Sequence, residues 1–442
     1  MGELFFLQLL AFDWQFHLAL SVFTAPEGLK SLLIISYSMI FAAIEAALFL
    51  PLISSKSSLN LRSLFMRVPI CILFESFLPR PFPWTYGHLF HENLGILRWA
   101  SVIGFQGLTA IILISSYSIA TNIYEKKYIK ALALMCIFPI LGLIPLKIPQ
   151  EGKSLRTLIV QPNIRGNNPA SFTLLKEMTE NALKKQDSSK LDLIVWPESV
   201  IPMDYFFQKK EELQTWIKSL HQNIMIHGII PYDTQRSSKE KFLYRSVSFL
   251  WDNQGKIINT YDKHRGFPLG ESHGVIQYIP WILPYFDSSI TQGEIKISDK
   301  ETIFKIRDQS IAPLICYDAV DTTWVNHISK SVQAFIHQSN TSWLEISPDA
   351  IYGFPMTYKF RAIETGKSFL SVSNSGPSIG YHPNGTLFLE PTQIQTSLTE
   401  VIDFPMYSKN SFYIVYGQWI NLFILLLSVL LFLRYELPFF RS

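Results

Sequence analysis

Long apolar stretches alternate with short polar loops over the first 150 residues, and a sixth apolar stretch lies near the C-terminal end. A helix that spans a bilayer needs roughly 20 mostly apolar residues. Four of the first five stretches reach that length, while the third is shorter and carries Glu75. The six stretches are residues 4–24, 31–53, 66–79, 99–119, 129–147 and 412–433. We therefore expect a membrane domain of about five transmembrane helices at 1–150, and a C-terminal transmembrane helix with a short cytoplasmic tail at 409–442.

Basic residues in the connecting loops predict how these helices are oriented. Short cytoplasmic loops carry an excess of Lys and Arg. The basic residues just before or at the start of the third and fifth stretches are Lys56, Arg62, Arg67, Lys126, Lys127 and Lys130. Both loops are expected in the cytoplasm, so the region between the fifth and sixth stretches is expected outside it. This topology requires the short third stretch to span the bilayer, and the alternative that it only dips into the membrane stays open.

Residues 151–408 have the pattern of a soluble domain in which strands and helices alternate. Apolar runs typical of buried strands are separated by expected helices near 170–186, 207–220 and 355–365. Asp252-Asn253-Gln254-Gly255 has the composition of a hairpin loop, with Gly where a positive φ is required. The expected strands are Leu155–Gln161, Asp192–Trp196, Ile224–Ile230, Phe242–Trp251, Lys256–Tyr261, Ile311–Ile315, Gln333–His337 and Ser368–Ser373. A last hairpin is expected to turn at Pro383-Asn384-Gly385. This order predicts an α/β layered sandwich.

Charge and cysteine content exclude several functions. A formal net charge of +3 over 442 residues gives no reason to expect nucleic-acid binding. The three cysteines form neither a disulfide framework nor a metal cluster. His88 and His91 are close in sequence, but two histidines without further ligands are a weak metal signal. No metal and no other cofactor is expected.

Three apolar runs of the middle domain each end in a reactive side chain. The stretch Ile311–Val320, reading IAPLICYDAV, presents Cys316, LIVWPES presents Glu198, and YDKHRGFPLGE presents Lys263 and Glu271. A free cysteine is usually buried and inert, and charges after strands are usually solvated. Taken separately, each of these residues is therefore interpreted as structural.

Taken together, the three groups supply what acyl transfer through a thiol requires. A carboxylate can take the thiol proton, because the thiolate is the nucleophile. A lysine ammonium and a backbone N–H can stabilise the oxyanion of the tetrahedral intermediate. A covalent thioester then divides one difficult transfer into two easier steps.

Several motifs in a fixed order give the sequence a family resemblance. WPES, YDKHRGFPLGE, ICYD and QSNTSW resemble the nitrilase, or carbon-nitrogen hydrolase, superfamily, whose members use a Glu–Lys–Cys triad. ESFLPRPFPWTYG and FRAIETGKSFLSVSNSGPSIGYHPNG resemble its membrane-bound branch, the apolipoprotein N-acyltransferases. The resemblance runs from about Glu75 to the C-terminal helix. It implies a nitrilase-like α-β-β-α sandwich inserted between transmembrane α-helices, on the outer side of a multi-pass protein of the bacterial inner (cytoplasmic) membrane.

The resemblance also implies a reaction and roles for individual residues. An acyl chain would pass from a phospholipid to Cys316 as a thioester, and then to the α-amino group of the diacylglyceryl-cysteine of an apolipoprotein. Glu198 would be the general base and Lys263 the oxyanion partner. The implied supporting residues are Glu271, Asp318 and Tyr317, whose N–H would complete the oxyanion hole, and the implied substrate-binding residues are Asn340, Trp343, Trp84 and Gly87.

The sequence departs from this branch at a few points and leaves two other functions open. Asp318 stands where the branch usually has Glu, no Trp follows Asn163, and about two N-terminal helices are missing. One alternative is a membrane-anchored amidase, in which water resolves the thioester; the membrane helices and the PFPW loop favour transfer over it. The other is a non-catalytic lipoprotein-binding paralogue, and the presence of all three triad residue types argues against it.

Overall fold

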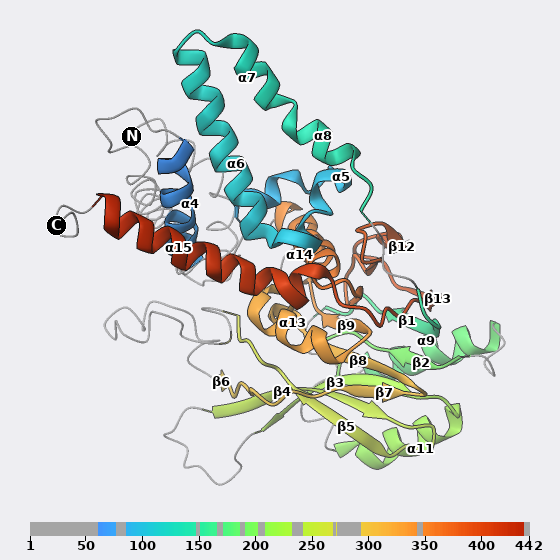
Figure 1. Cartoon of the computed structure of the whole chain (residues 1–442). Helices are drawn as coiled ribbons and strands as arrows, with labels where there is room; N and C mark the ends of the chain where they lie inside the picture. Colours follow the sequence, from blue (N-terminus) through green and yellow to red (C-terminus); the bar gives the residue numbers. More distant parts are fainter. Residues whose placement is uncertain are drawn as a thin grey trace, which may run out of the picture. The chain divides into compact units, whose positions relative to one another are not determined.

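The computed structural model describes most of the chain after residue 60, arranged in two compact units (Figure 1). One unit holds the described residues up to 146 and from 411 onward, and the other holds those from 151 to 410. The expected helices at 4–24 and 31–53 lie outside the described residues, as do Trp84 and Trp343. The described ranges are 61–76, 85–146, 151–165, 171–185, 191–201, 208–231, 242–267, 271, 293–342 and 348–436.

The first unit is helical. Among its described helices, α6 (Ala100–Tyr124) and the stretch Tyr413–Tyr435 are long and apolar enough to cross a membrane. Both coincide with apolar stretches that the sequence marks as membrane helices. The remaining elements are α4 (Leu61–Ser76), η1 (Tyr86–Phe90), α5 (Leu94–Leu97), α7 (Tyr128–Met135), α8 (Ile137–Leu143), and η8 (Tyr413–Gly417) with α15 (Gln418–Glu436), which together form the last helical stretch.

The apolar stretch at 129–147 forms two consecutive helices where the sequence predicts one. α7 ends at Met135 and α8 begins at Ile137. Pro139 has no backbone N–H, so it cannot donate the intrahelical hydrogen bond to the carbonyl of Met135. The break therefore falls at the carbonyl that Pro139 leaves without its helical donor.

The second unit contains two mixed β-sheets. One is seven-stranded, with the order β13-β1-β2-β3-β4-β5 and β6 paired to β4, and the other is six-stranded, with the order β12-β11-β10-β9-β8-β7. In each sheet three neighbouring strands are parallel, β1-β2-β3 and β8-β9-β10, and antiparallel strands flank them. The two sheets therefore repeat the same plan.

Most predicted strands of this unit are confirmed. β1 (Leu155–Gln161), β4 (Phe242–Trp251) and β10 (Ser368–Ser373) have the predicted bounds. The others that were predicted are β2 (Leu193–Val195), β3 (Ile224–Pro231), β5 (Ile257–Asp262), β8 (Gln309–Ile315), β9 (Ala334–Ser339), β11 (Ile379–Tyr381) and β12 (Leu387–Leu389). The sequence pattern does not predict β6 (Gly293–Ile295), β7 (Phe304–Ile306), β13 (Leu398–Phe404) or α13 (Thr322–Ile328).

Helices cover the outer faces of both sheets, which gives the predicted α/β sandwich. α9 (Ser171–Lys185) and α11 (Lys210–Leu220) pack on the first sheet, and α14 (Pro348–Thr365) packs on β10 and β11 of the second (Figure 1). Contacts of β1 with β10 and of β4 with β8 join the sheets face to face. The order of layers is therefore α-β-β-α.

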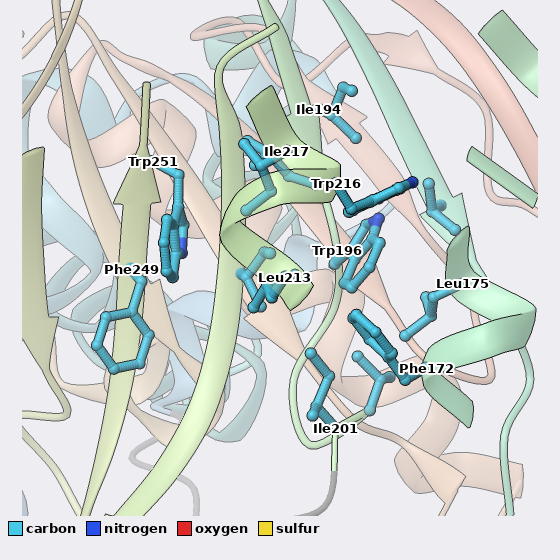
Figure 2. Packing of buried hydrophobic residues seen from close by; sticks show 14 of the residues in the cluster. Phe172, Leu175, Ile194, Trp196, Ile201, Leu213, Trp216, Ile217, Phe249 and Trp251 are labelled. Carbon is cyan, nitrogen blue, oxygen red and sulfur yellow. The ribbon is translucent and has the colours of Figure 1, made fainter. Parts of the chain in front are cut away.

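Buried aromatic side chains join α9 and α11 to the first sheet (Figure 2). The rings of Trp196 and Trp216 lie 5.4 Å apart, and the edge of Phe172 meets both. The indole N–H of Trp196 donates to Thr179 Oγ1 at 3.1 Å. Aromatic pairs of this kind contribute about 0.5–1.5 kcal/mol beyond their buried area. This packing fixes Trp196, which directly follows β2 and lies two residues before Glu198.

Candidate active site

Three strand ends of the second unit bring the predicted reactive residues together. Glu198 follows β2, Lys263 follows β5 directly, and Cys316 follows β8 directly. All three side chains are buried, and Lys263 is fully inaccessible to solvent. Parallel strands direct their carboxyl ends to one edge of a sheet, and ligand sites form there in α/β proteins. The sandwich therefore brings an acid, a base and a thiol from two sheets to one place.

Lys263 lies between two carboxylates. Its Nζ donates to Glu271 Oε1 at 2.7 Å and to Glu198 Oε1 at 3.4 Å. Glu271 is itself fixed, because its Oε2 accepts the N–H of Phe267 at 2.8 Å. Burial lowers the pKa of Lys263, but the neighbouring Cys316, Glu271 and Glu198 outweigh burial and hold this pKa well above its usual value. The lysine is thus a permanent cation in the site.

The thiol of Cys316 and the carboxylate of Glu198 are hydrogen-bonded to each other. Burial, opposed by the charge of Lys263, raises the pKa of Glu198 to about 7. Burial and the charge of Glu198 also raise the pKa of Cys316 well above its usual value. The resting site therefore holds a neutral thiol beside a carboxyl group that is poised to accept a proton near neutral pH.

The backbone turns sharply at Cys316. Its φ of 49° lies in the left-handed region, and the 3-10 helix η5 (Cys316–Val320) begins there. A non-glycine residue in this region costs roughly 1–2 kcal/mol. The carbonyl of Cys316 accepts a hydrogen bond from Nε2 of the buried His337 at 2.7 Å. Nδ1 of His337 lies 2.9 Å from the Ser371 hydroxyl on the next strand.

The backbone turns in the same way beside Glu198. Ser199 has a φ of 55°, and its N–H donates to Nδ1 of the buried His227 at 3.0 Å. Nε2 of His227 lies 2.7 Å from the Ser246 hydroxyl on β4. The second oxygen of Glu198 accepts the backbone N–H of Asn340 at 3.0 Å. Both ends of the carboxylate are therefore held in place.

Asp318 joins the turn at Cys316 to the segment that carries Lys263. Its Oδ1 accepts the N–H groups of His264 at 3.0 Å and Arg265 at 2.6 Å. Its Oδ2 accepts the Tyr261 hydroxyl at 2.8 Å and the N–H of Ile315 at 3.0 Å. Burial raises its pKa to about 6 against the opposing charge of Lys263 and these hydrogen bonds. With four donors on two oxygens, Asp318 serves as a tether between the two loops.

Tyr317 and Asn340, two of the predicted site residues, border this centre. The ring of Tyr317 packs edge-on against Phe267, with ring centres 5.2 Å apart. Asn340 contacts Glu198 through its backbone, while its side-chain Oδ1 accepts from Ser342 N and from Asn374 Nδ2, both at 3.1 Å. The Asn340 side chain thus contacts its own loop, through Ser342, and the segment after β10, through Asn374.

Gly87, predicted as a substrate-binding residue, belongs to the helical unit. Its N–H donates to Thr109 Oγ1 on α6 at 2.9 Å. A Cβ at this position would lie 2.5 Å from the carbonyl oxygen of Phe105. The neighbouring His88 stacks on Phe105, with ring centres 4.2 Å apart. Glycine is therefore required here for close packing of η1 against α6.

Several residues around the site were not predicted from the sequence. His227 and His337 lie within apolar strands, reading IMIHGIIP and AFIHQS, so a polar residue in an apolar run was the available signal. Burial and the charge of Glu271 also raise the pKa of Tyr244 to about 12. Among the described residues, no group of three or more His, Cys, Asp or Glu side chains is arranged to hold a metal ion.

The sequence of this chain matches a known family and named relatives. Residues 157–402 match the carbon-nitrogen hydrolase family. An apolipoprotein N-acyltransferase from Wigglesworthia glossinidia brevipalpis is 28% identical over 69% of this chain and 62% of its own length. One from Shewanella oneidensis is 25% identical over 76% of this chain and 66% of its own length. The matched regions thus span a little under two thirds of these two relatives.

Solved structures include similar folds at low sequence identity. An amidase from Nesterenkonia sp. AN1, with the acetamide moiety of fluoroacetamide on its active-site cysteine, is 12% identical. The match covers 62% of this chain and 97% of that chain, with a TM-score of 0.46. A cysteine mutant of the same enzyme, described as belonging to the nitrilase superfamily, is 13% identical, with coverage of 63% and 100% and a TM-score of 0.45.

Proposed function

The chain belongs to the carbon-nitrogen hydrolase family, and on this premise we propose that it is a phospholipid:apolipoprotein N-acyltransferase. The observation that carries the proposal is the buried group of Glu198, Lys263 and Cys316. In it the thiol is hydrogen-bonded to the Glu198 carboxylate, and the ammonium of Lys263 donates to the same carboxylate. The names of the relatives at 22–28% identity support the choice of substrates. The substrates and the roles of individual residues are part of this proposal.

The first half-reaction forms the thioester. The thiol proton of Cys316 passes to Glu198, and the sulfur attacks the ester carbonyl carbon of a phospholipid. Lys263 and the backbone N–H of Tyr317 stabilise the oxyanion, a contribution worth several kcal/mol in such sites. The carbon–oxygen bond then breaks, the proton returns from Glu198 to the leaving oxygen, and a lysophospholipid departs.

The second half-reaction transfers the chain. The α-amino group of a diacylglyceryl-cysteine attacks the thioester carbonyl, and Glu198 takes a proton from the amine. The carbon–sulfur bond breaks and the proton returns to the sulfur, which restores the thiol. Asn340, Trp343, Trp84 and Gly87 are assigned to substrate binding by family resemblance, Gly87 through the packing of its loop.

A membrane setting favours transfer between lipids over amide hydrolysis. Two described helices are long and apolar enough to span a bilayer, and α15 exposes large apolar side chains. Extracting an acyl chain into water would cost about 0.8 kcal/mol for each methylene group. We place the protein in the bacterial inner membrane as a multi-pass protein, with the catalytic unit on the outer side. A site at the surface of one leaflet would meet both substrates there.

Thioester formation tests the mechanism. Purified protein incubated with phospholipid should gain the mass of one acyl chain on Cys316, visible by mass spectrometry of the intact chain. Cys316→Ser is the matched control and should show no thioester. Glu198→Gln should lower the rate of adduct formation by about 10²-fold or more without loss of the fold. An adduct of equal size on Cys316→Ser, or none on the wild type, would exclude this mechanism.

The acyl acceptor is tested separately. The loaded enzyme should transfer its chain to a diacylglyceryl-cysteine peptide faster than to water. Expression of the gene should also sustain growth of a bacterium depleted of its own N-acyltransferase, whereas the Cys316→Ser variant should not. Release of free fatty acid without acylated peptide would instead identify a hydrolase.

A further inference from the structure

We propose that His337 and His227 are positioning residues, which hold the nucleophile and the general base by hydrogen bonds to the backbone of the turns that carry them. The inference rests on the proposed function, because it concerns how Cys316 and Glu198 are placed for reaction. His337 lies in β9, the middle one of three parallel strands, and His227 lies in β3, which pairs in parallel with β2 and antiparallel with β4.

His337 holds the turn at the nucleophile. A carbonyl only accepts hydrogen bonds, so the 2.7 Å contact to Cys316 O requires a proton on Nε2 of His337. The other ring nitrogen, Nδ1, then accepts the Ser371 hydroxyl at 2.9 Å. Tyr358 helps to hold the His337 ring, since the Tyr358 hydroxyl is hydrogen-bonded to Ser371 and the centres of the two rings lie 4.7 Å apart. The imidazole ring of His337 thus connects the turn at Cys316 to Ser371 on β10.

His227 holds the turn at the base with its opposite nitrogen. The backbone N–H of Ser199 donates to Nδ1 of His227, which must therefore be unprotonated. Nε2 then donates to the Ser246 hydroxyl at 2.7 Å. The carbonyl of Ser246 accepts the N–H of Lys263 at 2.9 Å. This histidine thereby joins the turn beside Glu198 to the strand that aligns Lys263.

Both rings are neutral, which fixes their roles. Burial lowers the pKa of each histidine to about 3. Neither is a proton carrier at neutral pH. The ring nitrogens of both histidines contact backbone groups and serine hydroxyls. Each instead makes one hydrogen bond with the backbone of a residue whose φ is positive, 49° at Cys316 and 55° at Ser199. Residues in this strained region persist where the surrounding contacts hold them.

The opposite use of the two ring nitrogens allows a crossed substitution test. The amide nitrogen of Gln can replace the Nε2 donor of a histidine, while the amide oxygen of Asn can replace its Nδ1 acceptor. His337→Gln should therefore keep the bond to Cys316, and His337→Asn should lose it. At position 227 the order reverses, so that His227→Asn keeps the bond to Ser199 and His227→Gln loses it. Packing alone would make Gln and Asn behave alike at both positions.

The readout is the rate at which iodoacetamide alkylates Cys316, followed by mass spectrometry in a Cys71→Ser/Cys136→Ser background. This reaction needs no phospholipid, so it separates failure of this inference from failure of the proposed acyl transfer. We expect His337→Gln and His227→Asn to stay within about threefold of the parent, and the other two variants to fall by about ten- to one-hundredfold, as misplaced reacting groups do. The initial thioester rate should follow the same order, with the KM for phospholipid unchanged.

Two results would contradict the positioning roles of His337 and His227. Equal rates for Gln and Asn at both positions, or parent rates for all four variants, would overturn the inference. If the histidine variants do not fold, Ser371→Ala and Ser246→Ala remove only the hydroxyl behind each ring. Slower alkylation of Cys316 in these two variants would support the inference, and an unchanged rate would refute it.

Discussion

At the scale of single residues, Lys263 determines the charge balance of the site. Its buried ammonium lies 2.7 Å from Glu271 and 3.4 Å from Glu198. Removing one partner of a buried ion pair typically costs about 3–5 kcal/mol, because the remaining charge stays buried. We expect Lys263→Met to lower the free energy of unfolding by roughly this amount, and thioester formation by about 10²-fold or more. Denaturant titration and mass spectrometry measure the two effects.

A second substitution separates stability from catalysis. Adding Glu271→Gln to Lys263→Met removes one of the two repelling carboxylates. The double variant should regain part of the lost stability and none of the lost activity. Recovery of activity with the lysine still absent would mean that Lys263 serves only to neutralise Glu271.

The raised pKa of Glu198 predicts a pH dependence for the reaction. Its deprotonated form is the proposed base, and burial raises its pKa to about 7. The rate of thioester formation should therefore rise with pH through about 7 and level off above it. The linkage to stability has the opposite sign, since the contribution of protonated Glu198 is complete below pH 4.5 and is lost as the pH rises through about 7. Rates measured from about pH 5.5 to about pH 8.5 test this, and a flat profile would exclude Glu198 as the base.

The residue types of the site were predictable, but their supports were not. Glu198, Lys263 and Cys316 each follow an apolar run, which is visible in the sequence. Grouping the three rested on the chemistry that acyl transfer requires and on family resemblance, because distances across two sheets do not follow from strand periodicity. His227 and His337 are visible only as polar interruptions of strands, and their partners depend on strand register.

At the scale of elements, Asp318 connects η5 to the loop after β5. The sequence raised the question of whether this side chain can replace a longer carboxylate. Four hydrogen-bond donors surround it at 2.6–3.0 Å. Truncation to Ala would leave those donors unpaired in a buried site, so Asp318→Ala should cost roughly 2–5 kcal/mol of stability. Urea unfolding at constant pH measures it.

A substitution that changes only the length of the Asp318 side chain is the control for Asp318→Ala. Asp318→Glu adds one methylene to a position without solvent exposure, and overpacking of this kind typically costs about 1–3 kcal/mol. We expect the charge to be retained and both stability and Cys316 reactivity to fall. A neutral Asp318→Glu substitution would show that the loops adapt to either carboxylate.

Strands were predicted best where both faces are buried. Every residue of β10 is buried, and six of the seven residues of β1 are. The missed strands are short or half exposed: β7 has three residues, and five of the seven residues of β13, at the edge of its sheet, are partly or fully exposed. Such segments gain their hydrogen bonds from a partner strand that is distant in sequence, so local pattern does not mark them.

At the scale of the whole molecule, one chain holds a helical unit, with two stretches long and apolar enough to cross a membrane, and an α-β-β-α unit that carries the candidate active site. The sequence predicted this division from the change in apolar content near residue 150 and again near residue 410. The fold of the catalytic unit followed from the order of strands and helices. The orientation in the membrane depends on loop charges alone, and it can be tested directly.

Lys127 and Lys305 are exposed lysines, one in each unit, and they allow the proposed orientation to be measured. In a background with Cys71, Cys136 and Cys316 replaced by Ser, single Lys127→Cys and Lys305→Cys variants carry one thiol each. A membrane-impermeant maleimide should label Lys305→Cys in intact spheroplasts, because the catalytic unit is proposed to lie outside the cytoplasm. Lys127→Cys, in a loop whose basic residues predict a cytoplasmic position, should react only after permeabilisation. The reverse pattern would invert the topology, and the active site would then face the cytoplasmic leaflet and its phospholipids.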